Sequence, residues 1–294
     1  MHVPVLLNET IDGLKLQPNE NVVDCTLGAG GHAAAALART APDGKLLGLD
    51  VDEAALEAAR STLGAYGSRA MLVRENYRNV ERVLHTQSFG PIHAALLDLG
   101  FSSLEIDDPT RGFSFRFDGP LDMRFDRTQD ETAASIVNSW NADDLSRILW
   151  EYGQEKFARK IADGIVKSRR EERILTTKQL VDVIAHSVPG FYRRSKLPFP
   201  TRTFQALRIA TNDELGNVRS VLPVLFDALA PGGRLAVISF HSLEDRIVKR
   251  FFLEKAAEGR ASIVSKRPIT ATDEEIKRNS RSRSAKLRIA VKTP

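Results

Sequence analysis

The chain has 294 residues, of which 42% are hydrophobic and 27% charged, with a net charge of +4. This composition is that of a globular protein with one large domain, or with one domain that carries a smaller one. The single cysteine, Cys25, excludes an internal disulfide and a metal site built from cysteines. The six histidines have no ligand spacing, so no bound metal is expected.

No apolar run reaches the roughly 18 residues that a membrane span requires. The segment from Met1 to Leu7 lacks the basic flank and the cleavage site of a signal peptide. We therefore expect a cytoplasmic protein with no membrane partner.

Short apolar runs alternate with helical patterns up to Leu99. The rhythm predicts right-handed crossovers onto a parallel sheet, which is a doubly wound, Rossmann-like α/β domain. The predicted strands are Asn21–Cys25, Lys45–Asp50, Ala70–Arg74 and His93–Leu99, and the predicted helices between them are Ala33–Arg39 and Glu53–Leu63.

The rhythm stops after Leu99, and residues 101–132 have no sustained period, as expected of a functional loop. Strand character returns late in the chain. We therefore expect a sheet domain in two parts, residues 1–104 and 206–294, split by a small helical substrate-recognition domain at residues 105–205. The patterns behind this division are helices at Ala142–Leu149, Gln154–Arg170, Thr177–His186 and Val218–Leu229, and strands at Arg234–Phe240 and Ala285–Val291.

A glycine-rich turn follows the first predicted strand. Gly28, Gly30 and Gly31 let a ligand approach the backbone where the next helix offers its N-terminus. Asp50 ends the second strand, 22 positions after Gly28, where a carboxylate can accept both hydroxyl hydrogens of a ribose. A nucleotide-like ligand is therefore indicated.

The same glycines also satisfy the dinucleotide fingerprint, which leaves an NAD-dependent oxidoreductase as an alternative. Asp24 disfavours it, because a carboxylate suits the amino group of a methionine moiety and repels a pyrophosphate. Asp98 ends the fourth strand beside the crevice, where it suits a cationic sulfonium. Tyr77 follows the third strand, where its ring can stack on an adenine or pack in the core.

Basic residues cluster in two segments, and such clusters are typical either of a solvated surface or of a polyanion site. Next to a cofactor site they favour a nucleic-acid substrate. The first cluster comprises Arg193, Arg194, Lys196, Arg202 and Arg208, and the second comprises Arg260, Lys266, Arg267, Lys277, Arg278, Arg281, Arg283, Lys286, Arg288 and Lys292. The candidate RNA-binding residues are Arg202, Arg208, Arg281 and Arg283 for phosphate, and Phe113 and Phe115 for an unpaired base.

Long motifs over nearly the whole chain resemble one family, the ribosomal RNA small-subunit methyltransferase H group, also called MraW. The matching segments are residues 5–9, 28–32, 96–100 with Ser102 and Ser103, 111–115, 119–124, 152–155, 201–209, 231–234 and 238–246. The resemblance implies a class I methyltransferase fold with an inserted helical domain. It also implies S-adenosylmethionine as the methyl donor.

The acceptor implied by the resemblance is the exocyclic N4 of a cytosine in the decoding region of 16S ribosomal RNA, within the small subunit or a late assembly particle. Carried over by position, the cofactor residues are Gly30, Gly31, His32, Asp50, Tyr77 and Asp98. Glu105 stands where the family usually has glutamine, which puts that contact in doubt, and Tyr77 replaces a frequent phenylalanine but keeps a ring.

Asp98 is also the candidate catalytic residue, because the methylated amine must lose a proton to a nearby acceptor. A role in cofactor binding alone stays open for it. His241, in the loop after the fifth strand, is a secondary candidate beside a structural role. A non-catalytic RNA-binding module on the same fold also remains an alternative, and the sequence leaves open whether two copies form a homodimer.

Overall fold

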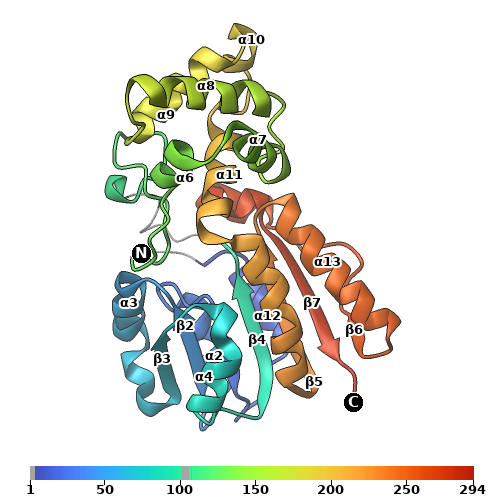
Figure 1. Cartoon of the computed structure of the whole chain (residues 1–294). Coiled ribbons are helices and arrows are strands. Elements are labelled where there is room, and N and C mark those ends of the chain that lie inside the picture. Colours follow the sequence, from blue (N-terminus) through green and yellow to red (C-terminus); the bar gives the residue numbers. More distant parts are fainter. Residues whose placement is uncertain (1–3, 101–105, 107) are drawn as a thin grey trace. The chain divides into compact units, whose positions relative to one another are not determined.

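The structure is a computed structural model that describes residues 4–100, 106 and 108–294 (Figure 1). The chain divides into two compact units. Unit 1 comprises Met1–Gly100 and Leu215–Pro294, and unit 2 comprises Phe101–Glu214. The second junction, at Glu214, lies nine residues beyond the position 205 expected from the sequence, because helix α11 (Thr201–Asn212) is continuous and packs on helices of unit 2.

Unit 1 is built on a seven-stranded sheet of order β3-β2-β1-β4-β5-β7-β6. Neighbouring strands from β3 to β5 are parallel, whereas β7 is antiparallel to both β5 and β6. The predicted α/β class is therefore confirmed, with the reversal of strand order falling between β1 and β4. The strands are β1 (Val22–Asp24), β2 (Leu46–Asp50), β3 (Ala70–Arg74), β4 (Ile92–Asp98), β5 (Leu229–Ser239), β6 (Ala261–Ile263) and β7 (Lys286–Lys292).

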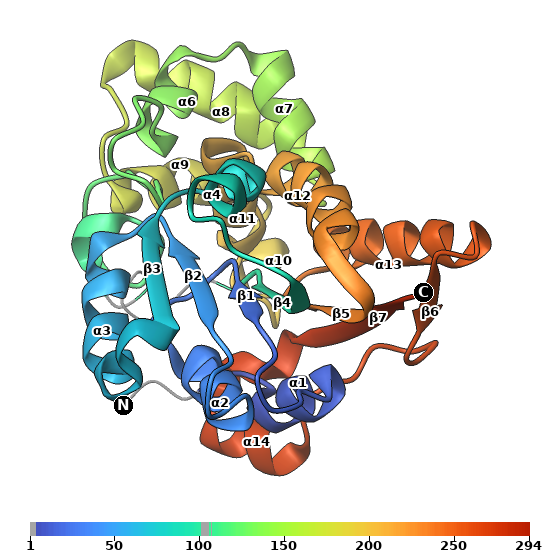
Figure 2. The same cartoon turned by 90° about the horizontal axis from the view of Figure 1, so that it is seen from below.

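Helices cover both faces of this sheet (Figure 2). Successive strand residues alternate between the two faces, so Val22 and Leu96 belong to one core cluster, and Val23 and Leu97 belong to the other. The first face is covered by α1 (Leu7–Leu14), α2 (Gly31–Arg39) and α3 (Glu53–Leu63), and the second by α4 (Val80–Thr86), α12 (Glu214–Ala228) and α13 (Ser242–Ala257). Shorter elements are α14 (Asp273–Arg278) and the 3₁₀ turns η1 (Gly64–Arg69), η2 (Tyr77–Asn79) and η4 (Ser280–Ser284).

Unit 2 is helical and has its own core, in which Leu149, Ile161 and Leu180 are fully buried. Thr132 and Thr176 begin two of its helices with capping boxes. Within the part of this unit that the structure describes, β pairing is limited to an isolated bridge. Its elements are η3 (Pro109–Arg111), α6 (Ala133–Ser139), α7 (Ala142–Glu151), α8 (Ala158–Glu171), α9 (Thr177–Ser187), α10 (Gly190–Arg193) and α11.

No helix among residues 4–100, 106 and 108–294 combines the length and the apolar character needed to cross a membrane.

The packing of the central strand β4 can be tested at Leu97, whose side chain is fully buried. Leu97→Ala is expected to lower the free energy of unfolding by roughly 2–5 kcal/mol, because it leaves a cavity in the core. Urea denaturation followed by circular dichroism measures this loss. Leu253→Ala is the control, since Leu253 is 50% exposed on α13 and its truncation should cost about 0.5 kcal/mol or less. Equal losses for the two variants would contradict the packing described.

Candidate functional site

Three aspartates lie at the carboxyl ends of neighbouring strands. Asp24, Asp50 and Asp98 are the last residues of β1, β2 and β4. The parallel register pairs Asp24 with Gly48 on one side and with Leu96 on the other, so all three strands end at the same edge of the sheet. Open α/β sheets bind ligands beyond this edge, where the strand order reverses. The structure therefore brings together the three carboxylates that the sequence analysis selected.

The turn between β1 and α2 requires its glycines. Gly28 and Gly30 have φ angles of 53° and 81°, which L side chains rarely adopt. Gly31 begins α2, and a Cβ there would lie 2.2 Å from Cγ of Pro4. The turn thus presents bare backbone at the N-terminus of α2, beside the acidic edge, as expected of a site for a nucleotide-like ligand.

Asp50 fastens this turn to β2. Its Oδ2 atom accepts a hydrogen bond from the Gly28 amide at 2.8 Å, and its Oδ1 atom accepts one from the Asp52 amide at 2.9 Å. Burial raises the pKa of Asp50, although the two backbone donors oppose the shift. Because each carboxylate oxygen has two lone pairs, both keep acceptor capacity for the hydroxyl groups of a ribose.

Thr26 links the ends of β1 and β4. Its amide donates to Oδ1 of Asp24 at 3.1 Å, and its Oγ1 accepts a hydrogen bond from the Asp98 amide at 2.6 Å. Asp24 itself is only 2% exposed. Its carboxylate therefore mainly orients the turn and has little contact with solvent. Thr26 was not among the predicted site residues, because its only signal in the sequence is a hydroxyl residue between the strand and the glycines.

Burial disfavours ionisation of the acidic edge. Burial raises the pKa of Asp24 to about 7, and the neighbouring Asp50 carboxylate contributes to the shift. Burial also raises the pKa of Asp98 to about 7, with smaller contributions from Asp24 and Glu244. A cation bound at this edge favours the ionised carboxylates. The electrostatics therefore suit a ligand that carries a sulfonium or an ammonium group.

His32 lies between the N-terminal segment and Asp98. Its Nε2 atom is 3.0 Å from the carbonyl oxygen of Val5. Because a carbonyl only accepts, Nε2 carries the proton of this hydrogen bond. Its Nδ1 atom lies 3.8 Å from Oδ2 of Asp98, and the ring is 7% exposed. The His32 side chain, which the family resemblance selected for cofactor binding, thus lies near the carboxylate that we expect at the reaction centre.

Two further cofactor candidates lie farther along the chain. Tyr77 is the first residue of η2, shortly after β3, and its ring is partly buried against the core on the second face of the sheet. The last residue of β3, Arg74, pairs with Asp50 in the sheet, so Tyr77 follows the same edge. Glu105 lies outside the described residues.

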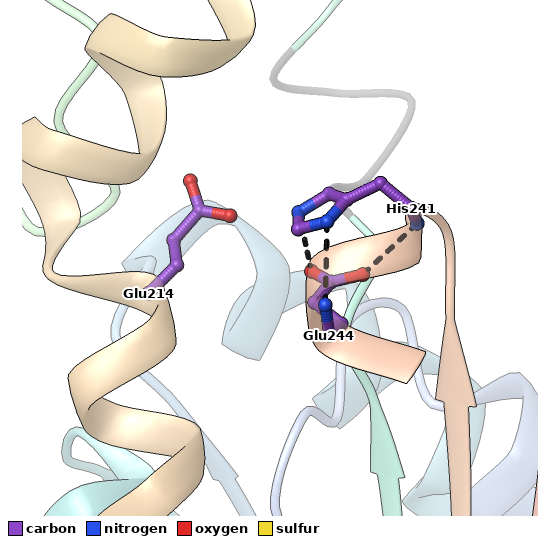
Figure 3. A group of neighbouring side chains, drawn as sticks. All are labelled: Glu214, His241 and Glu244. Atoms are coloured by element: carbon purple, nitrogen blue, oxygen red, sulfur yellow. Dashed lines mark hydrogen bonds and ion pairs between the residues drawn. The ribbon is translucent and has the colours of Figure 1, made fainter. Parts of the chain in front are cut away.

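His241 has a structural role as the N-cap of α13 (Figure 3). Its Nδ1 accepts a hydrogen bond from the Glu244 amide at 3.4 Å, and its Nε2 lies 3.2 Å from Oε1 of Glu244. Glu244 completes the capping box by accepting from the amides of Phe240 and His241. Glu214, also drawn in Figure 3, begins α12 and pairs with Arg208 through two hydrogen bonds of 2.8 and 2.9 Å.

The aromatic candidates for RNA contact pack against the core of unit 2. Phe113 stacks on Phe125 with ring centroids 5.2 Å apart, and Phe115 meets the ring of Phe204 edge to face at 5.3 Å. Both rings lie at the periphery of the helical core. A ring that also stacked on a base would have to contact both the core and the RNA. We therefore attribute most of the burial of these two rings to packing within unit 2.

The arginine candidates differ in their surroundings. Arg208 is held by the buried Glu214, whereas Arg202 donates from Nη1 to the carbonyl of Gln154. Arg281 and Arg283 lie on η4, where Arg283 is exposed and Arg281 is half-buried. Arg288, from the same basic tail, is 8% exposed and pairs with Asp245 at 2.6 Å, so it stabilises the fold.

Comparisons with known proteins match one family over nearly the whole chain. The family described as "MraW methylase family" matches residues 1–293. A protein of Symbiobacterium thermophilum, named ribosomal RNA small subunit methyltransferase H, is 46% identical over 306 residues, which cover 99% of this chain and 96% of the relative. A protein of the same name from Heliobacterium mobile is 46% identical over 307 residues, covering 99% of this chain and 98% of the relative.

The raised pKa of Asp24 predicts how the ligand-free chain responds to pH. An aspartate ionises near pH 3.8 when unperturbed, whereas the buried carboxyl ionises at about 7. Between these values the unfolded state loses its proton first, so this group lowers stability as pH rises and the loss is complete above the folded pKa. Asp24→Asn should therefore gain stability relative to the wild type from about pH 4 to about pH 8. Thermal melting of both chains measures the difference, and a gap that stays constant with pH would contradict the assignment.

Proposed function

The chain belongs to the MraW methylase family, and we propose that it methylates the exocyclic N4 of a cytosine in the decoding region of 16S ribosomal RNA with S-adenosylmethionine as donor. The observation that carries the proposal is the acidic edge formed by Asp24, Asp50 and Asp98 around the glycine turn. The names of the relatives support small-subunit ribosomal RNA as the substrate. The base and the atom rest on the motif resemblance. We place the reaction in the cytoplasm, on the small subunit or a late assembly particle.

The described residues fit the proposed donor. S-adenosylmethionine supplies a methyl group bonded to a positively charged sulfur. Asp50 offers acceptor lone pairs for a ribose, and the backbone at Gly28 and Gly30 leaves room for close approach. Asp24 and Asp98 place negative charge at the same edge, which stabilises a cation and would repel the pyrophosphate of NAD. The donor set therefore favours the methyltransferase over the oxidoreductase.

We assign to Asp98 the role of proton acceptor. The donor, when bound, would supply its methyl group to N4, and the sulfur would keep the electron pair of the carbon–sulfur bond. The nitrogen then carries one proton too many. A carboxylate with a pKa of about 7 accepts a proton efficiently near neutral pH. The Asp98 amide donates to Oγ1 of Thr26, and Oδ1 of Asp98 accepts a hydrogen bond from the Gly100 amide at 3.2 Å, which holds the carboxylate in position for this role.

Donor binding can be tested at Asp50. Asp50→Ala is expected to weaken the affinity for S-adenosylhomocysteine by roughly 10- to 100-fold, because it removes the charged acceptor of the ribose hydroxyls. Isothermal titration calorimetry measures the affinity. Asp50→Asn keeps one acceptor oxygen, so its affinity should lie between those of the wild type and Asp50→Ala. The wild type should show no binding heat with NAD. Unchanged affinity in both variants would remove Asp50 from the site.

The reaction itself can be tested with small ribosomal subunits from cells that lack the enzyme, incubated with S-adenosylmethionine whose methyl group is labelled. We expect the label to be recovered as N4-methylcytidine. Asp98→Asn should lower kcat by roughly 100-fold or more and abolish the rise in rate through about pH 7. Tight binding of the donor without any methyl transfer would instead support the non-catalytic RNA-binding module.

A further inference from the structure

An exposed aromatic ring lies in a segment of unit 2 that carries only positive charge. Phe191, on the short helix α10, is 67% exposed. Residues 189–202 contain Arg193, Arg194, Lys196 and Arg202, and no aspartate or glutamate. The three basic residues from 193 to 196 are all exposed. An exposed ring among cations is not explained by the packing of unit 2.

The ring of Phe191 packs against a small cluster of aromatic side chains. Phe191 meets Phe157 edge to face with ring centroids 6.3 Å apart, and Phe157 meets Tyr192 in the same way at 4.9 Å. Tyr192 is anchored in turn, since its hydroxyl donates to Oε2 of the fully buried Glu155 at 2.7 Å. The ring therefore contacts an anchored aromatic neighbour while the residue stays 67% exposed.

The cations of this segment are exposed to solvent. Among the residues that the structure describes, no carboxylate forms an ion pair with Arg193, Arg194 or Lys196. Lys156 and Lys160 add two exposed ammonium groups next to Phe157, and Nζ of Lys160 lies 5.9 Å from the centre of that ring. Arg147 and Arg159, two other exposed arginines of unit 2, differ, since they are paired with carboxylates of their own helices or of neighbouring ones.

We propose that residues 190–197 form a binding surface for single-stranded RNA, on which Phe191 stacks against an unpaired base and Arg193, Arg194 and Lys196 bind the flanking phosphates. Stacking on aromatic rings within a basic groove is how proteins hold single strands without reading their sequence. The inference rests on the proposed function, because it gives unit 2 a contact to the RNA that the enzyme modifies.

A membrane surface fits these residues less well. Amphipathic helices that lie on bilayers present a broad apolar face over several turns. Helix α10 has four residues, Gly190–Arg193, and its neighbours are basic. Free phosphate would use the cations but would gain nothing from the ring. An RNA strand uses both features.

The stacking role can be tested with the full chain and a fluorescein-labelled single-stranded RNA of about 12 nucleotides, with binding followed by anisotropy. Phe191→Ala is expected to raise the Kd by about fivefold or more, and Phe191→Tyr should retain the affinity because it keeps the ring. Trp150→Ala is the matched control, since Trp150 is 64% exposed but lies on α7 beside Glu151 and the paired Arg147. An equal effect of Phe191→Ala and Trp150→Ala would overturn the proposal.

The phosphate contacts can be tested through the salt dependence of the same binding. The triple variant Arg193→Gln, Arg194→Gln, Lys196→Gln should lower the slope of log Kd against log salt by roughly 2, about 0.7 for each contact to a single strand. A control triple variant, Arg39→Gln, Arg60→Gln, Arg147→Gln, removes the same charge from exposed residues that already have carboxylate partners. This control should leave the slope nearly unchanged, and equal slopes for the two triple variants would contradict the assignment.

Failure of this surface and failure of the proposed function give different results. If Phe191→Ala methylates small subunits with unchanged KM and kcat, the methyltransferase stands and the surface does not. If the surface is correct, the KM for the subunit rises while kcat is retained. Binding to vesicles of anionic lipid that is lost in the first triple variant, with RNA affinity unchanged, would assign the surface to membranes and overturn the proposal.

Discussion

The hydrogen-bonded register of β1 between β2 and β4 is the constraint on which the candidate site depends. It places Asp24, Asp50 and Asp98 at one edge although they come from three separate strands. A slip of one residue in β1 would move Asp24 by about 3.3 Å and turn its side chain to the opposite face of the sheet. The core prevents such a slip, because Val22 and Val23 would then exchange their hydrophobic clusters. The position of the acidic edge is thus fixed by apolar residues that lie outside it.

Forming this site costs free energy of folding, and the rest of the fold offsets that cost. Burial makes ionisation of Asp24 and Asp98 unfavourable in the free chain, and their proximity adds to this cost. Groups whose pKa values are shifted by burial and by like charge are frequent where a protein acts on a ligand. Thr26 bonds to both aspartates, and the Gly100 amide donates to Oδ1 of Asp98 at 3.2 Å. A cationic ligand would relieve the repulsion among carboxylates that these contacts hold together.

Much of the sheet and the three carboxylates could be predicted from the sequence, because strand periodicity and a glycine turn are local signals. Other features depend on contacts that no local pattern reveals. Thr26 bonds to Asp98, 72 positions away, and His32 to Val5, 27 positions away. The predicted helix from Gln154 begins instead at Ala158, because Gln154 has a φ angle of 51°. The clustering of basic residues in the sequence likewise did not predict the structural role of Arg288, because its partner Asp245 lies on another element. Helix α13 (Ser242–Ala257) was not predicted, since the residues at its start read as a loop after the fifth strand.

The division of unit 1 between two chain segments affects how the protein is made. Strand β4 ends at Asp98, and its partner β5 begins only at Leu229, after unit 2. At a synthesis rate of roughly 5–20 residues per second, the ribosome needs on the order of 10 seconds to deliver the missing strand. Throughout that interval one side of β4 has no backbone partner, and an open strand edge invites wrong pairing. Unit 2 is continuous in the chain and can complete its core earlier. The nascent protein therefore carries a finished helical unit before the sheet to which it is joined can close.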